Sequence, residues 1–221
     1  MAKKIIYFVR HGETVLNAQG IRQGAEGSLS DRGREQALQT AKKFPKHRGR
    51  PQIILASPFE RAKETAEIIS RELHLDIKYS PLLVERKNPS EIIGLSRTDP
   101  RVKAIVDRID NGFHEDDLRY SDEENFTDLR ARAKAALAFI AGRRERRIIV
   151  VTHSIFLQML VAYMLYPKKL TASEYNKLAF FNPIDNAALT ICTFTPHLLR
   201  RDEWKLLVWN DEMDETPEEL K

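Results

Sequence analysis

The chain is poor in cysteine and has no long hydrophobic run. Its 221 residues contain one cysteine, Cys192, which excludes a disulfide or a cysteine-based metal cluster within the chain. Cys192 lies in an apolar, strand-like run, so we expect an unreactive core thiol. No apolar run approaches the roughly 20 residues that a membrane-spanning helix needs. The first residues, Met1–Lys4, pass straight into a strand-like run and leave no room for a signal peptide. We therefore expect a cytoplasmic protein with no membrane partner.

Charge is distributed unevenly along the chain. The formal net charge is +4, but residues 211–221 hold six acids against one lysine, a net −5, which leaves +9 for residues 1–210. A basic body favours anionic ligands. The two basic runs, residues 42–50 and 143–147, each fall between a helical pattern and a strand, where a solvated loop is expected. We therefore expect no nucleic-acid partner, and we expect residues 211–221 to be a frayed acidic tail.

Strand-like runs alternate with helical patterns along the chain. The expected strands span residues 5–9, 52–56, 75–79, 147–152, 187–193 and 204–208. The expected helices span residues 34–44, 57–73 with a Ser57 cap and Pro58, 89–95, a segment opening at 99–100, 126–140 and 155–166. This alternation predicts an α/β fold, a three-layer sandwich with a mostly parallel central sheet and helices on both faces. We expect one domain over residues 1–210, with a small helical cap inserted at about 86–125.

Polar residues follow three of the apolar strands. Arg10 and His11 end the first, Ser57 and Arg61 follow the second, and His153 follows the strand at 147–152. The carboxyl ends of strands in open α/β sheets are where ligands bind. Gly12 allows a sharp turn and a close approach to a ligand. If the strands are neighbours, these cations and imidazoles surround a phosphate-like anion. The alternative is a strand that ends in a solvated Arg-His pair.

Four segments in order resemble one family. Arg10-His11-Gly12-Glu13-Thr14 with Asn17 is similar to the signature of the histidine phosphatase superfamily, the phosphoglycerate-mutase-like enzymes. Three further matches follow: Gln23-Gly24 with Leu29–Ala37, Ser57–Ala66 in the pattern S-P-x-x-R-A-x-x-T-A, and Val150–His153.

The resemblance implies roles for individual residues. His11 is the implied nucleophile, which forms a phosphohistidine that water hydrolyses, and Arg10, Arg61 and His153 hold the phosphate. Only neutral histidine attacks, and neighbouring arginines lower its pKa. Asn17, Gln23 and Gly24 are implied substrate-binding residues. Ser154 stands where relatives often have glycine, which narrows the pocket or adds a hydroxyl.

The proton for the leaving oxygen has two candidate donors. The resemblance places Glu85, in Leu82-Leu83-Val84-Glu85, at the family's acid. The residues that follow, Arg86–Glu91, depart from the Gly and Trp-Glu-Gly of many relatives, so Glu91 stays a second candidate. Plainer interpretations also stay open: a structural histidine for His153, a helix-surface ion pair for Arg61 and a surface glutamate for Glu85.

Three functions remain open at this point. The first is a phosphatase without metal or cofactor, acting on a phosphorylated metabolite or a phosphoprotein and releasing inorganic phosphate. The second is a phosphoglycerate-type mutase, which retains the phosphoryl group, and the third is a silent phosphate-binding scaffold. The cap is expected to choose the substrate. The sequence carries no indication of oligomeric state.

Overall fold

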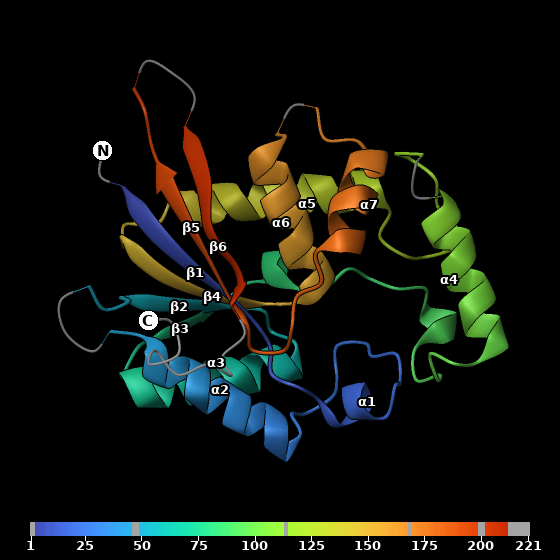
Figure 1. Ribbon diagram of the computed structural model, residues 1–221, viewed down its shortest axis with the longest axis horizontal. Helices are drawn as coiled ribbons and strands as arrows, with labels where there is room; N and C mark the ends of the chain where they lie inside the picture. Colours follow the sequence, from blue (N-terminus) through green and yellow to red (C-terminus); the bar gives the residue numbers. More distant parts are fainter. Residues whose placement is uncertain (1–2, 46–48, 113–114, 168, 199–201, 212–221) are drawn as a thin grey trace, which may run out of the picture.

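The computed structural model describes residues 3–45, 49–112, 115–167, 169–198 and 202–211. Its strands are β1 (Lys4–Arg10), β2 (Ile53–Ala56), β3 (Ile77–Tyr79), β4 (Arg147–Thr152), β5 (Leu189–Thr195) and β6 (Glu203–Asp211). Its helices are α1 (Val15–Ala18), α2 (Asp31–Lys43), α3 (Glu60–Leu73), α4 (Pro100–Gly112), α5 (Phe126–Ala141), α6 (Ser154–Leu165) and α7 (Ala172–Phe181), with 3₁₀ turns η1 (Pro81–Leu83) and η2 (Ser90–Ile92). The predicted α/β fold is confirmed (Figure 1).

The strands form one sheet in the order β3-β2-β4-β1-β5-β6. Neighbours among β3, β2, β4 and β1 pair in parallel, whereas β5 is antiparallel to both β1 and β6. The parallel part of the sheet needs helical crossovers, which α2, α3 and α5 provide. The sheet is therefore mostly parallel, as predicted, with an antiparallel hairpin at one edge.

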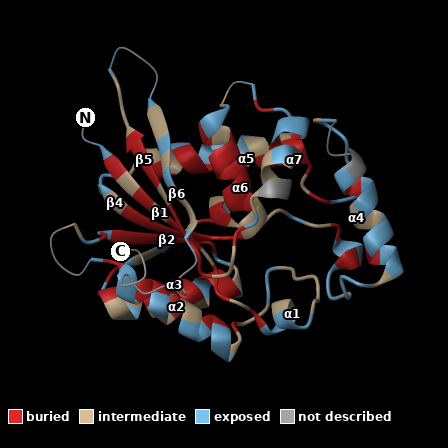
Figure 2. Ribbon diagram, viewed as in Figure 1, coloured by how far each residue is buried: buried red, intermediate tan, exposed pale blue. Residues whose placement is uncertain are grey.

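Both faces of the central strands are buried (Figure 2). Side chains of β1, β2 and β4 alternate between two clusters: Ile6, Phe8, Ile53, Leu55, Ile148 and Val150 pack with α5 and α6, whereas Val9, Ile54, Ala56, Ile149 and Val151 pack with α2 and α3. Burial on both faces explains why these strands read as unbroken apolar runs. The helices thus complete the three layers of the sandwich.

Two helix starts differ from the sequence prediction. α2 begins at Asp31 rather than Arg34, because the Ser30 hydroxyl accepts a hydrogen bond from Gly33 N at 3.0 Å and caps the helix. The prediction of Ser57 as the cap of α3 was wrong. The N-cap is Phe59, which lacks a side-chain cap bond, and α3 begins at Glu60. The Ser57 hydroxyl is instead bonded to a histidine of the candidate site.

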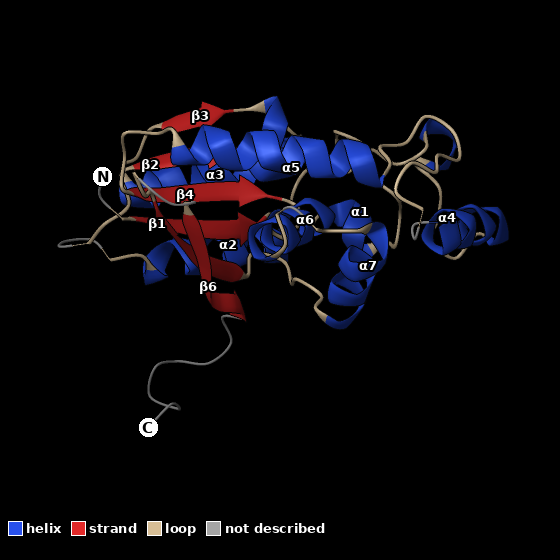
Figure 3. Cartoon of the chain, turned by 90° about the horizontal axis from the view of Figure 1, so that it is seen from above, coloured by secondary structure: helices blue, strands red, loops and turns tan. Residues whose placement is uncertain are grey.

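The segment between β3 and α5 is irregular. The helix expected at 89–95 is a single 3₁₀ turn, η2, followed by Gly94 at φ +82°, a conformation that ends it. The helix expected to open at Asp99-Pro100 is present as α4, which Figures 1 and 3 place at the far end of the molecule from the strands. Sequence analysis missed the short α1 and α7.

Some predictions fall on parts of the chain outside the described residues. Of the acidic tail, Asp211 is the last residue of β6, and residues 212–221 lie outside. Residues 46–48 of the first basic run also lie outside. Among the residues that are described, no helix is long and apolar enough to cross a membrane.

Candidate active site

Three neighbouring strands deliver the predicted residues to one place. β4 lies between β2 and β1. The hydrogen bonding between strands continues one residue past the ends of β1 and β2, since His11 N donates to Thr152 O at 3.0 Å and Ser57 N donates to Val151 O at 3.0 Å. The rings of His11 and His153 consequently lie with centroids 5.1 Å apart. The carboxyl edge of the parallel sheet is therefore where the imidazoles gather.

The hydrogen bonds of His11 define its tautomer. Nδ1 lies 2.7 Å from the Gly12 carbonyl oxygen, which can only accept, so Nδ1 carries the proton. Nε2 then keeps its lone pair and accepts a hydrogen bond from Arg61 Nε at 3.2 Å. Arg61 Nη1 donates to Gly24 O at 2.9 Å, which fixes the guanidinium beside the ring. The Nε2 lone pair of His11 thus faces Arg61.

Burial and neighbouring cations keep the site histidines neutral. The His11 side chain is buried, and burial, followed by Arg61 and Arg10, lowers its pKa well below 6.5, against an opposing bond to Gly12. Burial, then Arg61, also lowers the pKa of His153 well below 6.5. Burial lowers the pKa of Arg61 to about 10, against an opposing effect of the Glu85 carboxylate. The guanidinium therefore stays protonated at neutral pH. Two neutral imidazoles therefore sit beside charged arginines.

His153 has one nitrogen occupied and one free. Nε2 lies 2.8 Å from Ser57 Oγ, and the edge of Phe59 packs against the ring at 5.3 Å. Nδ1 is buried, and none of the described residues offers it a hydrogen-bond partner. Buried polar atoms normally have a partner, so a bound ligand oxygen suits Nδ1.

Arg10 shows the same pattern. Its Nη1 donates to Ile184 O, in the segment that leads into β5. Its Nε is buried without an acceptor among the described residues. Glu85 and Asp185 both raise the pKa of Arg10, against the larger lowering by burial. The Nε–H of Arg10, the residue before His11, is thus left to donate a hydrogen bond to a ligand.

Glu85 lies at the N-terminus of α6. Its carboxylate accepts hydrogen bonds from Phe156 N at 3.0 Å, Ile155 N at 3.3 Å and Arg86 N at 2.9 Å. Helix N-termini favour anionic groups in this way. Arg132 holds the backbone at Glu85, since it donates to Val84 O at 2.7 Å and to Glu85 O at 3.4 Å, and it forms an ion pair with Glu124 at 2.6 Å.

A pocket of about 680 Å³ extends between Glu85 and Arg61, the arginine that donates to His11. Gln23, Gly24, Arg61 and Glu85 all line it. Glu91, the alternative acid, is an exposed residue of η2 and does not line it. Glu85 is therefore the better placed of the two.

Two of the implied substrate-binding residues, Asn17 and Ser154, lie at the N-terminal ends of helices. Asn17 Oδ1 accepts from Thr14 N at 3.3 Å and Asn17 N donates to Thr14 Oγ1, so its side chain closes a capping box on α1. Ser154 is the first residue of α6, directly before the N–H that Glu85 binds. Neither is among the residues that line the pocket with Glu85, and the same holds for Arg10, His11 and His153, which lie behind Arg61.

The turn after His11 depends on residues that sequence reasoning missed. Gly12 N donates to Thr65 Oγ1 at 3.1 Å, and Asn186 Nδ2 donates to His11 O at 3.1 Å. Thr65 is the threonine of the S-P-x-x-R-A-x-x-T-A motif, so the motif carried a signal for this contact. Asn186 lies in an irregular segment whose pattern carried none.

A backbone contact within the chain requires a glycine at position 12. A Cβ on Gly12 would lie 2.4 Å from Gly33 O, and one on Gly33 would lie 1.9 Å from Glu13 O. The turn after β1 therefore packs backbone against backbone on the first turn of α2. This contact holds the histidine-bearing loop against the helix layer.

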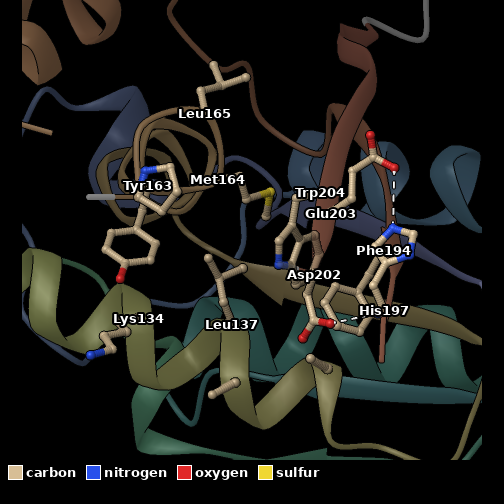
Figure 4. A pocket seen from close by; sticks show the side chains of 13 residues that line it. Lys134, Leu137, Tyr163, Met164, Leu165, Phe194, His197, Asp202, Glu203 and Trp204 are labelled. Carbon is tan, nitrogen blue, oxygen red and sulfur yellow. Dashed lines mark hydrogen bonds and ion pairs between the residues drawn. The ribbon is translucent and has the colours of Figure 1, made fainter. Parts of the chain in front are cut away.

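A second pocket, of about 590 Å³, lies between α5, α6 and the β5–β6 hairpin. Figure 4 shows Leu137, Met164 and Trp204 around it, with an ion pair between His197 and Glu203 at its rim. It borders the C-terminal end of α6, whereas the histidines lie at the N-terminal end. It contains none of the residues predicted for the site.

Comparison with known proteins identifies the family. A family model described as the histidine phosphatase superfamily (branch 1) matches residues 6–212. The chain belongs to the histidine phosphatase superfamily. This histidine phosphatase family member is 30% identical to a metal-independent phosphoserine phosphatase of Arabidopsis thaliana over 215 residues, 93% of this chain and 81% of the relative. It is also 30% identical to a probable phosphoglycerate mutase GpmB of Erwinia tasmaniensis over 167 residues, 72% of this chain and 74% of the relative.

Solved structures share the fold of this family member. A mycobacterial glucosyl-3-phosphoglycerate phosphatase, solved as a complex with VO3, superposes with a TM-score of 0.75 at 25% identity, covering 95% of this chain and 100% of that one. Another, titled mycobacterial hydrolase 2, gives a TM-score of 0.78 at 23% identity, covering 100% of this chain and 96% of that one.

Proposed function

We propose that this chain is a metal-independent phosphatase that hydrolyses a phosphomonoester through a phosphohistidine on His11. The observation that carries the proposal is the paired geometry of the His11 ring. Its Nδ1 proton is held by the Gly12 carbonyl, and its Nε2 lone pair faces Arg61. Such a ring is a neutral, oriented nucleophile at the place where an anion is bound.

In the first step, His11 Nε2 attacks phosphorus and the ester bond to the leaving oxygen breaks. Arg61 and Arg10 supply guanidinium donors to the phosphoryl oxygens, and the unpartnered Nδ1 of His153 supplies another. For that role the His153 proton is on Nδ1, and Nε2 accepts from Ser57. Glu85, protonated as the substrate binds, gives its proton to the leaving oxygen.

In the second step, water attacks the phosphorus of the phosphohistidine. The Glu85 carboxylate takes a proton from the water as the P–N bond breaks. Inorganic phosphate leaves, and His11 returns to the neutral form. Charge stabilisation comes from Arg10 and Arg61 rather than from a metal ion, so no metal or other cofactor is proposed.

The substrate is a phosphorylated metabolite or phosphoprotein, which the segment 86–125 acts as a cap to select. Five residues of this segment line the pocket, namely Lys87, Ser90, Ile93, Arg119 and Asp122. A structurally similar phosphatase was solved as a complex with VO3, which supports an oxyanion as a ligand of this chain. A cytoplasmic location stays a prediction.

A second candidate is a phosphoglycerate-type mutase. It is favoured by the relatives described as probable phosphoglycerate mutases, at 30–33% identity. A mutase has to shield its phosphohistidine from water and return the phosphoryl group to its substrate. Conversion of 3- to 2-phosphoglycerate tests it, and hydrolysis without any conversion excludes it.

The direct test of the proposed function is hydrolysis of p-nitrophenyl phosphate in the presence of EDTA. We expect the wild-type protein to turn over and His11→Ala to lose activity by more than about a thousandfold. His74→Ala is the matched control, since His74 lies at the end of α3. Equal turnover by wild type and His11→Ala would remove His11 from the mechanism, and no turnover by wild type would leave the scaffold interpretation.

A further inference from the structure

Arg132, in α5, uses its whole set of hydrogen-bond donors within the protein. Its Nε donates to Glu124 Oε1 at 2.7 Å, and its Nη2 donates to Glu124 Oε2 at 2.6 Å and to Glu85 O at 3.4 Å. Its Nη1 donates to Leu82 O at 3.2 Å and to Val84 O at 2.7 Å. A guanidinium has five N–H donors, so each has an acceptor. Arg132 therefore lines the pocket with Glu85 but keeps no N–H for a ligand.

Arg10 differs from Arg132 in this respect. The Nε of Arg10 is buried, and none of the described residues offers it an acceptor. A buried donor of this kind suits a ligand oxygen. The two arginines are thus equipped for separate tasks, since Arg10 can bind a phosphoryl oxygen whereas the bonds of Arg132 all end on protein atoms.

Arg132 contacts both parts of the chain that hold the Glu85 carboxylate. The first part is the backbone of residues 82–85, whose carbonyl oxygens accept from the guanidinium. The second part is Phe156 in α6, which packs beside α5 (Figure 1). The guanidinium lies over the Phe156 ring, 3.9 Å from its centroid, and Phe156 N donates to Glu85 Oε1 at 3.0 Å. One side chain thus contacts the backbone of Glu85 and the residue that binds its carboxylate.

Glu124 holds Arg132 in place. Both of its carboxylate oxygens accept from the guanidinium, which makes a bidentate pair, and both side chains are mostly buried. Glu124 N donates to Lys87 O at 3.0 Å, two residues after Glu85. The Arg132–Glu124 pair is therefore bonded to the chain before and after Glu85.

We propose that Arg132, held by Glu124, is a positioning residue that keeps the Glu85 carboxyl group at the leaving oxygen of the substrate. The inference rests on the proposed phosphatase function and adds a residue that acts through Glu85 rather than on the phosphate. Proton transfer is sensitive to a small displacement of the donor, whereas attack by His11 on a substrate with a good leaving group needs no proton. Loss of Arg132 should therefore slow only the reactions that need the acid.

Two aryl phosphates of equal charge and similar size separate these cases. p-Nitrophenyl phosphate has a good leaving group, and 4-methoxyphenyl phosphate has a poor one. For Arg132→Gln we expect the single-turnover rate with 4-methoxyphenyl phosphate to fall by about tenfold or more, and the rate with p-nitrophenyl phosphate to stay within about twofold of wild type. Arg132→Lys keeps the charge beside Glu124 but has fewer donors, so we expect a smaller loss with the same selectivity.

Arg130→Gln is the matched control. Arg130 belongs to the same helix, and its contacts are of the same kinds: the Phe126 ring at 5.3 Å, Leu170 O at 2.9 Å and Asp116. None of these contacts involves residues 82–87, so Arg130→Gln should leave both rates unchanged.

A double variant shows whether Arg132 acts through Glu85. In Glu85→Gln the proton donor is already gone, so adding Arg132→Gln should lower the rate with 4-methoxyphenyl phosphate by less than about twofold further. A residue that acts on the phosphate instead would add its full effect to that of Glu85→Gln.

The outcomes separate the positioning role from the proposed function. Equal losses with both aryl phosphates, no loss in either Arg132 variant, or full additivity with Glu85→Gln overturns the positioning role and leaves the phosphatase function standing. If circular dichroism shows that Arg132→Gln does not fold, the same two rates in Arg132→Lys decide. If wild-type protein hydrolyses neither aryl phosphate, the proposed function fails and the positioning role falls with it.

Discussion

Arg61 donates its Nε–H to Nε2 of His11 across 3.2 Å, and both side chains are buried. Burial, followed by this guanidinium, lowers the pKa of His11 well below 6.5. A cation placed on a nucleophile in this way lowers its pKa and supplies charge to the transition state.

Replacing Arg61 should therefore change both the rate of catalysis and the pKa of His11. Arg61→Gln is expected to reduce kcat/KM by about 10²–10³-fold and to raise the pKa of His11, because the guanidinium that lowers it is gone. For Arg61→Lys we expect a kcat/KM and a His11 pKa between those of the wild type and Arg61→Gln, since lysine keeps the positive charge but lacks the two parallel N–H donors of arginine. Steady-state kinetics and NMR titration of the His11 ring measure the two effects. An unchanged His11 pKa in Arg61→Gln would contradict this coupling.

Glu85 and Glu91 provide a matched pair for the proton donor. Glu85→Gln is expected to slow hydrolysis of alkyl phosphates by about 10²-fold or more, and that of p-nitrophenyl phosphate much less, because a good leaving group needs no proton. Glu91→Gln, in exposed η2, should leave both rates unchanged. Single-turnover rates with both classes of substrate make the comparison. An equal loss with both classes would point to damaged phosphate binding, and a selective loss in Glu91→Gln would reverse the assignment.

The buried histidines predict how stability depends on pH. The pKa values of His11 and His153 are well below 6.5 in the folded protein. Below pH 6.5 the unfolded chain therefore binds protons that the folded chain does not, so stability falls as pH falls. Each histidine contributes about 1.4 kcal/mol per pH unit in that range.

Urea unfolding at pH 7.5 and pH 5.5 measures this slope. His11→Gln and His153→Gln should each flatten it, whereas His74→Gln, whose residue lies outside the site, should not. A wild-type free energy of unfolding that does not change between the two pH values would contradict the prediction.

The contact between Gly12 and Gly33 predicts a backbone cost. Gly33→Ala places a Cβ 1.9 Å from Glu13 O and is expected to destabilise the fold by about 2–3 kcal/mol. Gly142→Ala is the control, because Gly142 is a helix C-cap with φ −71° whose Cβ would lie 3.3 Å from its nearest neighbour. Thermal unfolding of both variants gives the comparison. Equal melting temperatures for wild type and Gly33→Ala would show that the turn shifts freely.

The sequence predicted the central sheet well because its strands are buried on both faces. Ile148–Val151 and Ile53–Ala56 are continuous apolar runs, which is the pattern of parallel strands buried on both faces. Hydrophobic periodicity does not show which polar residues meet. The resemblance to the family supplied that information, through four motifs in the family's order. Together they indicated that His11, Arg61 and His153 meet.

What the sequence missed depended on contacts across long separations. Ser57 has the residue type of a helix cap, but its hydroxyl is taken by His153, 96 residues later. Gly12 is constrained by its contact with Gly33, in the first turn of α2. Asn186 holds the His11 carbonyl from a segment without regular structure. Local pattern carries no information on such pairs, since tertiary packing decides them.

The central claim, nucleophilic attack by His11 Nε2, is tested most directly by trapping the phosphoenzyme. Rapid quenching after mixing with a phosphorylated substrate, followed by mass spectrometry and ³¹P–¹H NMR of the labelled peptide, locates the phosphoryl group. We predict stoichiometric label on Nε2 of His11, because Nδ1 is held by the Gly12 carbonyl. Label on Nδ1 or on His153, or turnover with no labelled histidine, would contradict the account.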